Sequence, residues 1–188
     1  MRPDAPFHVG RTVPSSVGWT RVVVTVVAGL IVSGLLLQRG SAPGAIAVLA
    51  AFALLALWTW MGQATRFVVD GNGVTVSLGG FLPRRVWPIE DFRTVQLREI
   101  PTGTVGVALG GYGWRRGRAM TPKPEELTPV GRRKIFTLAE QQRPYRMLVT
   151  RPGTSVEIIG TKDTCYILSP VDPQAAADAI DQAIRARR

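Results

Sequence analysis

The sequence predicts a two-helix transmembrane hairpin followed by a mainly-β domain of about seven short strands, which a C-terminal α-helix closes. Two uncharged apolar stretches precede residue 63. After them, apolar residues recur at every second position, which is typical of β-strands. The last segment carries an apolar stripe on one helical face. With 188 residues, the chain is long enough for one domain with its own core.

The two apolar stretches cover residues 22–37 and 43–62 and contain no charged residue. At a rise of about 1.5 Å per residue the second is about 30 Å long, which matches the hydrocarbon core of a bilayer. The first reaches that length if Trp19 and Gln38 lie in the interfacial zones. Only residues 38–42 separate the two stretches, so we expect two antiparallel neighbouring helices.

The charges around the hairpin predict its orientation. The cations that flank its two ends are Arg2, Arg11, Arg21, Arg66, Arg84 and Arg85, whereas the turn contains only Arg39. The positive-inside rule then places both termini in the cytoplasm of a multi-pass protein of the cell (inner) membrane. We therefore divide the chain into an N-terminal cytoplasmic tail (1–18), a transmembrane hairpin (19–63) and a cytoplasmic domain (64–188).

Two alternatives to the hairpin remain open from the sequence. A cleaved signal peptide would use Arg21 as its basic region and residues 45–47, Ala-Ile-Ala, as its cleavage site. The other alternative is that both stretches are buried helices in the core of a soluble protein. About 40 residues would then have no polar face, whereas a helix at the surface of a soluble protein is amphipathic.

Alternation typical of strands starts directly after the hairpin. Residues 66–69 and 74–78 flank the turn sequence 70–73, Asp-Gly-Asn-Gly, and predict a β-hairpin. Further strands are expected at 92–100, 105–109, 135–137, 145–150, 155–159 and 164–168. Asp172 and Pro173 suit the N-cap and the first position of the last helix. A run of strands closed by one helix predicts a small β-barrel or sandwich.

A polar, strongly basic stretch at 115–134 interrupts the strands, and we expect it to be a long exposed loop. Its cations would contact anionic lipid headgroups, at about 1 kcal/mol per cation near the membrane, or a partner protein. The alternative is a solvated loop whose charge follows the positive-inside bias. The candidate lipid- or partner-binding residues are Arg84, Arg85, Arg115, Arg116, Arg118, Arg132, Arg133 and Lys134.

Composition excludes several classes of site. One Cys and one His cannot build a disulfide framework, a thiolate zinc site or a histidine-based triad. The acidic pairs Glu90–Asp91 and Glu125–Glu126 are sequence neighbours, which point to opposite faces of a strand and form no general acid–base dyad. Gly110–Gly113 lacks the spacing of phosphate-binding loops and is expected to form a turn or bulge. We expect no enzyme activity, metal or cofactor.

The net charge of +10 indicates a negative partner or surface. Nineteen of the 23 cationic and twelve of the 13 acidic residues follow Gln63, which leaves that part at about +7. This excess fits the positive-inside rule, and no nucleic-acid-binding module is present, so we expect no nucleic-acid partner.

Three segments resemble bacterial membrane-anchored pleckstrin-homology-like (PH-like) domains of the actinobacterial type. They are 70–74 (DGNGV), 85–92 (RVWPIEDF) and 110–115 (GGYGWR), the last followed later by Val-Asp-Pro at 171–173. The resemblance covers about residues 65–183 and implies a PH-like barrel after a helical hairpin. Two departures are the insertion at 115–134 and the turn 70–73, which lacks the cations that phosphoinositide-binding PH domains carry there.

We therefore expect a membrane-tethered PH-like interaction module at the cytoplasmic leaflet that binds a protein partner or anionic lipid. A homo-oligomer is one form that such a partnership could take. The alternative is an accessory subunit of a membrane enzyme or transporter complex, with no activity of its own.

Overall fold

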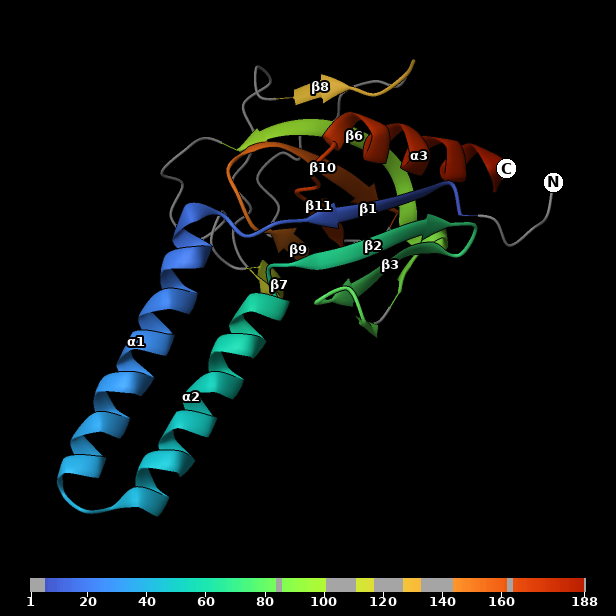
Figure 1. Ribbon diagram of the computed structural model, residues 1–188. Helices are drawn as coiled ribbons and strands as arrows, with labels where there is room; N and C mark the ends of the chain where they lie inside the picture. The colour runs from blue at the N-terminus through green and yellow to red at the C-terminus, as the bar shows by residue number, and fades with distance from the viewer. Residues whose placement is uncertain are drawn as a thin grey trace.

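The computed structural model describes residues 6–83, 86–100, 111–116, 127–132, 144–161 and 164–187. It contains two long helices, two β-sheets and a C-terminal helix (Figure 1). The elements are β1 (His8–Thr12), α1 (Ser16–Gln38), α2 (Ala42–Met61), β2 (Thr65–Asp70), β3 (Gly73–Leu78), β4 (Leu82–Pro83), β5 (Trp87–Pro88), the 3-10 turn η1 (Ile89–Asp91), β6 (Phe92–Ile100), β7 (Gly111–Arg116), β8 (Leu127–Pro129), β9 (Pro144–Val149), β10 (Gly153–Gly160), β11 (Cys165–Leu168) and α3 (Pro173–Ala186).

The two predicted apolar helices are confirmed as α1 and α2, which form an antiparallel pair (Figure 1). Ser15 caps α1 by accepting a hydrogen bond from the Gly18 amide at 3.2 Å. The helices approach closely at Gly29, where an added Cβ would lie 2.6 Å from the Cβ of Phe52. The Ser33 hydroxyl donates to the Ala45 carbonyl at 3.1 Å and joins the helices near their turn.

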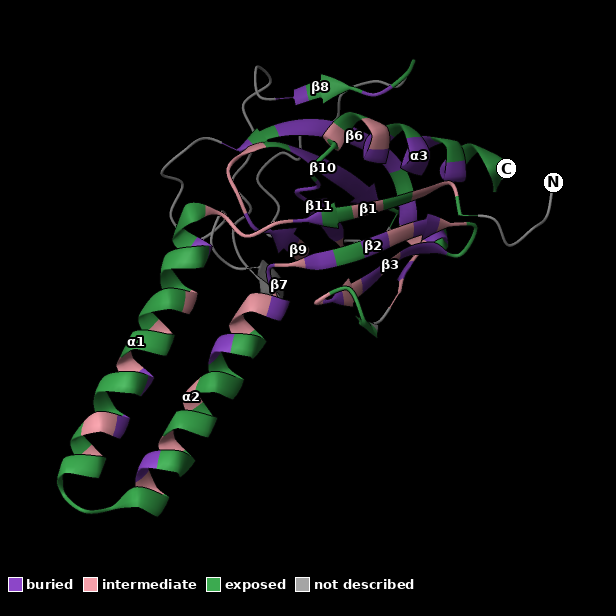
Figure 2. Cartoon of the chain, viewed as in Figure 1, coloured by how far each residue is buried: buried purple, intermediate pink, exposed green. Residues whose placement is uncertain are grey.

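The outer faces of the hairpin are apolar and exposed (Figure 2). Both helices are long and apolar enough to cross a membrane, and only 11% of α1's and 17% of α2's most apolar 18 residues are buried. Core helices of a soluble protein would be mostly buried, so the alternative of two buried helices in a soluble core does not fit these values. The cleavage site of the signal-peptide alternative, residues 45–47, lies inside α2.

A strand from before the hairpin belongs to the β domain. Residues 8–12, which sequence analysis placed in the N-terminal tail, form β1 and pair antiparallel with β2. Gly10 is required there because an added Cβ would collide with the Phe67 ring of β2. The first sheet has the order β1-β2-β3-β4, and β5 also pairs with β3.

The predicted β-hairpin is confirmed as β2 and β3. Its turn is closed by Asp70, whose Oδ1 accepts hydrogen bonds from the amides of Asn72 at 2.8 Å and Gly73 at 3.1 Å. Gly73 has a φ of +131°, and a side chain there would collide with the carbonyl oxygen of Trp87.

The second sheet has the order β7-β9-β11-β10-β6-β8. The strands predicted near 145–150, 155–159 and 164–168 are present as β9, β10 and β11, but β11 lies between the other two and runs parallel to β9. The described strands number eleven rather than about seven, and they form two sheets instead of a closed barrel.

The basic stretch 115–134 is not a continuous loop. Arg115 and Arg116 end β7, and residues 127–129 form β8, which pairs with β6. Residues 111–113, expected to turn or bulge, lie within β7 because they pair in register with β9. The strands expected at 105–109 and 135–137 lie outside the described residues.

One core joins both sheets to α3. The predicted N-cap is confirmed, since Asp172 Oδ1 accepts a hydrogen bond from the Ala175 amide at 3.0 Å. The apolar stripe of α3, including Ile180 and Ile184, is fully buried against side chains of both sheets. The other face of the second sheet carries a smaller apolar cluster that contains Cys165, which is buried as expected.

A buried ion pair lies beside that smaller cluster. Glu157 on β10 is completely buried and accepts hydrogen bonds from Gln96 Nε2 at 2.9 Å and Arg98 Nη1 at 3.3 Å, both on β6. The Tyr145 hydroxyl lies 3.5 Å from the same carboxylate. Because a charge without a partner is costly in such surroundings, these groups stabilise the sheet only as a set.

The hairpin and the domain are joined by a hydrogen-bonded junction around Thr12. Its hydroxyl donates to the Gln63 carbonyl at 2.8 Å and lies 2.8 Å from the Thr65 hydroxyl. Directly after β1, the Val13 carbonyl accepts a hydrogen bond from the Thr150 hydroxyl at 2.7 Å. The segment before α1 therefore contacts both the end of α2 and a turn of the second sheet.

Replacing Glu157 by Ala should lower the free energy of unfolding by about 3–5 kcal/mol, because Arg98 stays buried without its carboxylate. The Arg98→Met/Glu157→Met double variant should lose less. Unfolding of the full chain in neutral detergent, followed by circular dichroism, measures both. A double variant as unstable as the single one would contradict this account.

Thr12→Val should destabilise the junction by about 1–3 kcal/mol, because the Gln63 carbonyl and the Thr65 hydroxyl lose a buried partner. Thr75→Val, at a half-buried position of β3, is the matched control and should change little. Hydrogen exchange of the β1 and β2 amides should accelerate in Thr12→Val alone. Equal acceleration in both variants would contradict a special role for the junction.

Candidate functional site

The residues predicted to bind lipid or a partner are largely outside the described part of the chain. Arg84, Arg85, Arg118, Arg133 and Lys134 lie outside it. The backbone of Arg115 and Arg116 is described in β7. Arg132 is exposed in the turn after β8. The grouping of these cations at one surface therefore stays a prediction.

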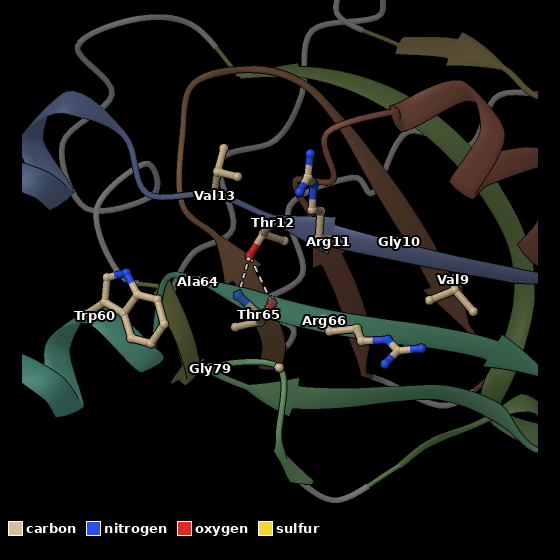
Figure 3. A pocket seen from close by; sticks show the side chains of 11 residues that line it. Val9, Gly10, Arg11, Thr12, Val13, Trp60, Ala64, Thr65, Arg66 and Gly79 are labelled. Atoms are coloured by element: carbon tan, nitrogen blue, oxygen red, sulfur yellow. Dashed lines mark hydrogen bonds between the residues drawn. The ribbon is translucent and has the colours of Figure 1, made fainter.

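A groove of about 480 Å³ lies where the end of α2 meets β1 and β2. Its residues come from three places that are far apart in the sequence: the segment before α1, the exit of α2, and the turn after β3 (Figure 3). The lining includes Arg11, Trp60, Ala64, Arg66, Gly79 and Gly80.

Two arginines from neighbouring strands lie opposite each other at this groove. The register pairs Arg11 of β1 with Arg66 of β2, so both side chains extend from the same face of the sheet. Both residues are exposed, and no described residue forms an ion pair with either guanidinium group. Like charges in opposed cross-strand positions repel, so this pairing destabilises the sheet unless an anion joins them.

Figure 3 shows the two guanidinium groups turned away from each other, as expected for like charges. Both side chains are long and exposed, and rotation about their side-chain bonds can bring them together. A phosphate is the fitting anion, because arginine presents paired N–H donors that match phosphate oxygens.

The apolar side of the groove is built by the exit of α2. Trp60 is partly buried and packs against the main core. The Gly79 amide donates to the carbonyl of Met61, the last residue of α2, at 3.1 Å. Gly79 and Gly80, which also line the groove, have φ values of +61° and +84°, a conformation that favours glycine.

A second cluster of chemically interesting groups surrounds Tyr166. Its ring packs against Trp87 and Phe92 at centroid distances of 5.1 and 5.3 Å, and its hydroxyl donates to Asp91 Oδ2 at 3.3 Å. Burial raises the pKa of Tyr166 to about 12, and the Asp91 carboxylate adds to the effect.

Both buried tyrosines of the second sheet stay protonated at neutral pH. Burial also raises the pKa of Tyr145, with a further contribution from the Glu157 carboxylate. Neither phenol is therefore suited to act as a general base. The described residues contain no group of His, Cys, Asp and Glu side chains that could hold a metal ion.

Sequence analysis used Arg11 and Arg66 only to orient the hairpin and missed them as a site. Their separation of 55 positions conceals a direct cross-strand pair. Residues 8–12 contain only one large apolar residue, Val9, so no apolar alternation marks them as a strand in the sequence.

Tyr166 should make the domain less stable above pH 10. The neutral phenol contributes fully below its ordinary pKa of 10.0, and this contribution is lost as pH rises toward about 12, because the unfolded chain releases the proton first. Tyr166→Phe should reduce the pH dependence of unfolding between these values. An unchanged slope would contradict the raised pKa.

Comparison with protein-family models, curated proteins and solved structures finds no match to this chain.

Proposed function

We propose that this chain is a membrane-anchored, non-enzymatic interaction module whose groove binds the headgroup of an anionic phospholipid at the cytoplasmic leaflet. The observation that carries the proposal is the cross-strand pair of Arg11 and Arg66 at a groove beside the end of α2. Two cations without an acidic partner among the described residues, next to an apolar wall, suit a ligand that combines phosphate with hydrocarbon.

The membrane placement rests on the hairpin. Its two helices are apolar on their exposed faces, and Trp19 and Trp58 are exposed near the end at which the chain enters and leaves the hairpin. Tryptophan favours the membrane–water interface, so this level is where headgroups would lie. The flanking cations support a cytoplasmic location for that end.

The anchor also makes weak binding sufficient. Each cation close to an anionic membrane surface contributes about 1 kcal/mol. Two cations correspond to a preference of about 30-fold for an anionic headgroup over a zwitterionic one. Tethering raises the effective concentration of lipid at the groove, so such affinities suffice for steady occupancy.

The resemblance to membrane-anchored PH-like domains is part of the proposal. It is supported by two packed sheets with a C-terminal helix after a helical hairpin. The parallel pairing of β9 with β11 and the open sheets are features that a simple antiparallel barrel lacks. A protein partner at the same surface, or a role as accessory subunit of a membrane complex, is the competing function.

Headgroup binding is tested by titrating short-chain phosphatidylglycerol or phosphatidylcholine into the full chain in neutral detergent. Tryptophan fluorescence reports binding, and the part of the change that Trp60→Phe removes comes from the groove, because Trp60, one of five tryptophans, lines it. The wild type should prefer phosphatidylglycerol, and Arg11→Gln and Arg66→Gln should each weaken its binding by about fivefold. Added salt should reduce the preference.

Arg39→Gln is the matched control, because Arg39 is exposed in the turn at the opposite end of the hairpin. Equal affinity for the two lipids, or an equal loss in the control, would sink the groove as a headgroup site. A loss confined to an Arg115→Gln/Arg116→Gln variant would instead move the site to the basic stretch.

A further inference from the structure

The turn after β3 and the first residue of β4 expose two large apolar side chains. Phe81, in the hydrogen-bonded turn, has 68% of its surface exposed, and Leu82, the first residue of β4, has 38%. The amides of Gly80 and Phe81 donate to the carbonyls of Ser77 at 3.2 Å and Leu78 at 3.3 Å. The turn is thus a defined structure that presents apolar groups outward.

This turn is fixed to the end of α2. The Gly79 amide donates to the Met61 carbonyl at 3.1 Å. An added Cβ at Gly79 would lie 2.8 Å from the Phe81 ring and 3.0 Å from Cγ of Met61, so the ring and the helix end both lie close to this glycine. Figure 1 shows the turn beside the last residues of α2, at the level where the helix meets the domain.

We infer that Phe81 and Leu82 insert into the interfacial region of the bilayer that holds the hairpin, as a third membrane contact beside α1 and α2. The inference rests on the membrane placement proposed above. Exposed Trp58 lies one turn before the end of α2, so the interfacial zone begins within a turn of Met61. Apolar side chains at that level gain by leaving water.

The insertion would fix the level at which the groove lies relative to the membrane surface. Gly79 and Gly80 line the groove and immediately precede Phe81. A turn held in the interface places the groove beside the lipid phosphates and restricts tilting of the domain on its hairpin. Leu82 also pairs with Leu78 of β3, which couples the inserted residues to the sheet that carries Arg66.

The test uses the full chain with Cys165→Ala, in nanodiscs containing lipids that carry a doxyl quencher near the headgroup. A fluorophore is attached to Phe81→Cys, to Gly71→Cys or to Trp58→Cys. Gly71 is the matched control: it is exposed in the β2–β3 turn, and an added Cβ there meets nothing within 4 Å. Figure 1 shows this turn at the end of β2 away from the helices.

Lipid quenching at position 81 should exceed that at position 71 several-fold, with less quenching by aqueous iodide. Quenching at 58 but not at 81 would overturn the inserted turn and leave the membrane hairpin intact. Quenching at none of the three positions would overturn both the membrane placement and the inference from it. Phe81→Asp, with total tryptophan fluorescence and circular dichroism as folding checks, should weaken lipid quenching at a label on Leu82→Cys by several-fold.

Discussion

The pairing of β1 with β2 is the constraint on which the rest of the structure depends. It joins a segment from before the helical hairpin to one from after it through five register pairs, and Thr12 adds hydrogen bonds to Gln63 and Thr65. This pairing holds both helix ends against the domain. It also builds one wall of the groove, because without β1 only Arg66 would remain on an exposed strand edge.

Two arrangements of arginine among the described residues show opposite treatments of charge. Arg98 is buried and is matched by Glu157 and by polar neighbours, as a cation in a low-dielectric layer must be. Arg11 and Arg66 are exposed, adjacent and without an acidic partner among the described residues. Solvation lets the two cations lie side by side at small cost.

Much of the architecture could be predicted because it depends on local signals. The apolar helices follow from length and composition, the β2–β3 turn from the side chain of Asp70, and the start of α3 from Asp172 and Pro173. The insertion of β11 between β9 and β10 could not be predicted, because strand order is decided by tertiary packing. β1 escaped notice because its five residues form a strand only through pairing with β2. The groove was missed for the same reason, because residues of β1 form part of its lining.

One consequence of β1 concerns how the protein is made. Residue 12 leaves the ribosome long before residue 65, its partner 53 positions later, and two apolar helices must be placed between them. The first strand therefore stays unpaired until both helices and β2 have been made, so the β domain can close only after the helical hairpin is complete. A fragment that starts after the hairpin would leave β2 as an open edge, with unpaired N–H and C=O groups that invite association with other chains.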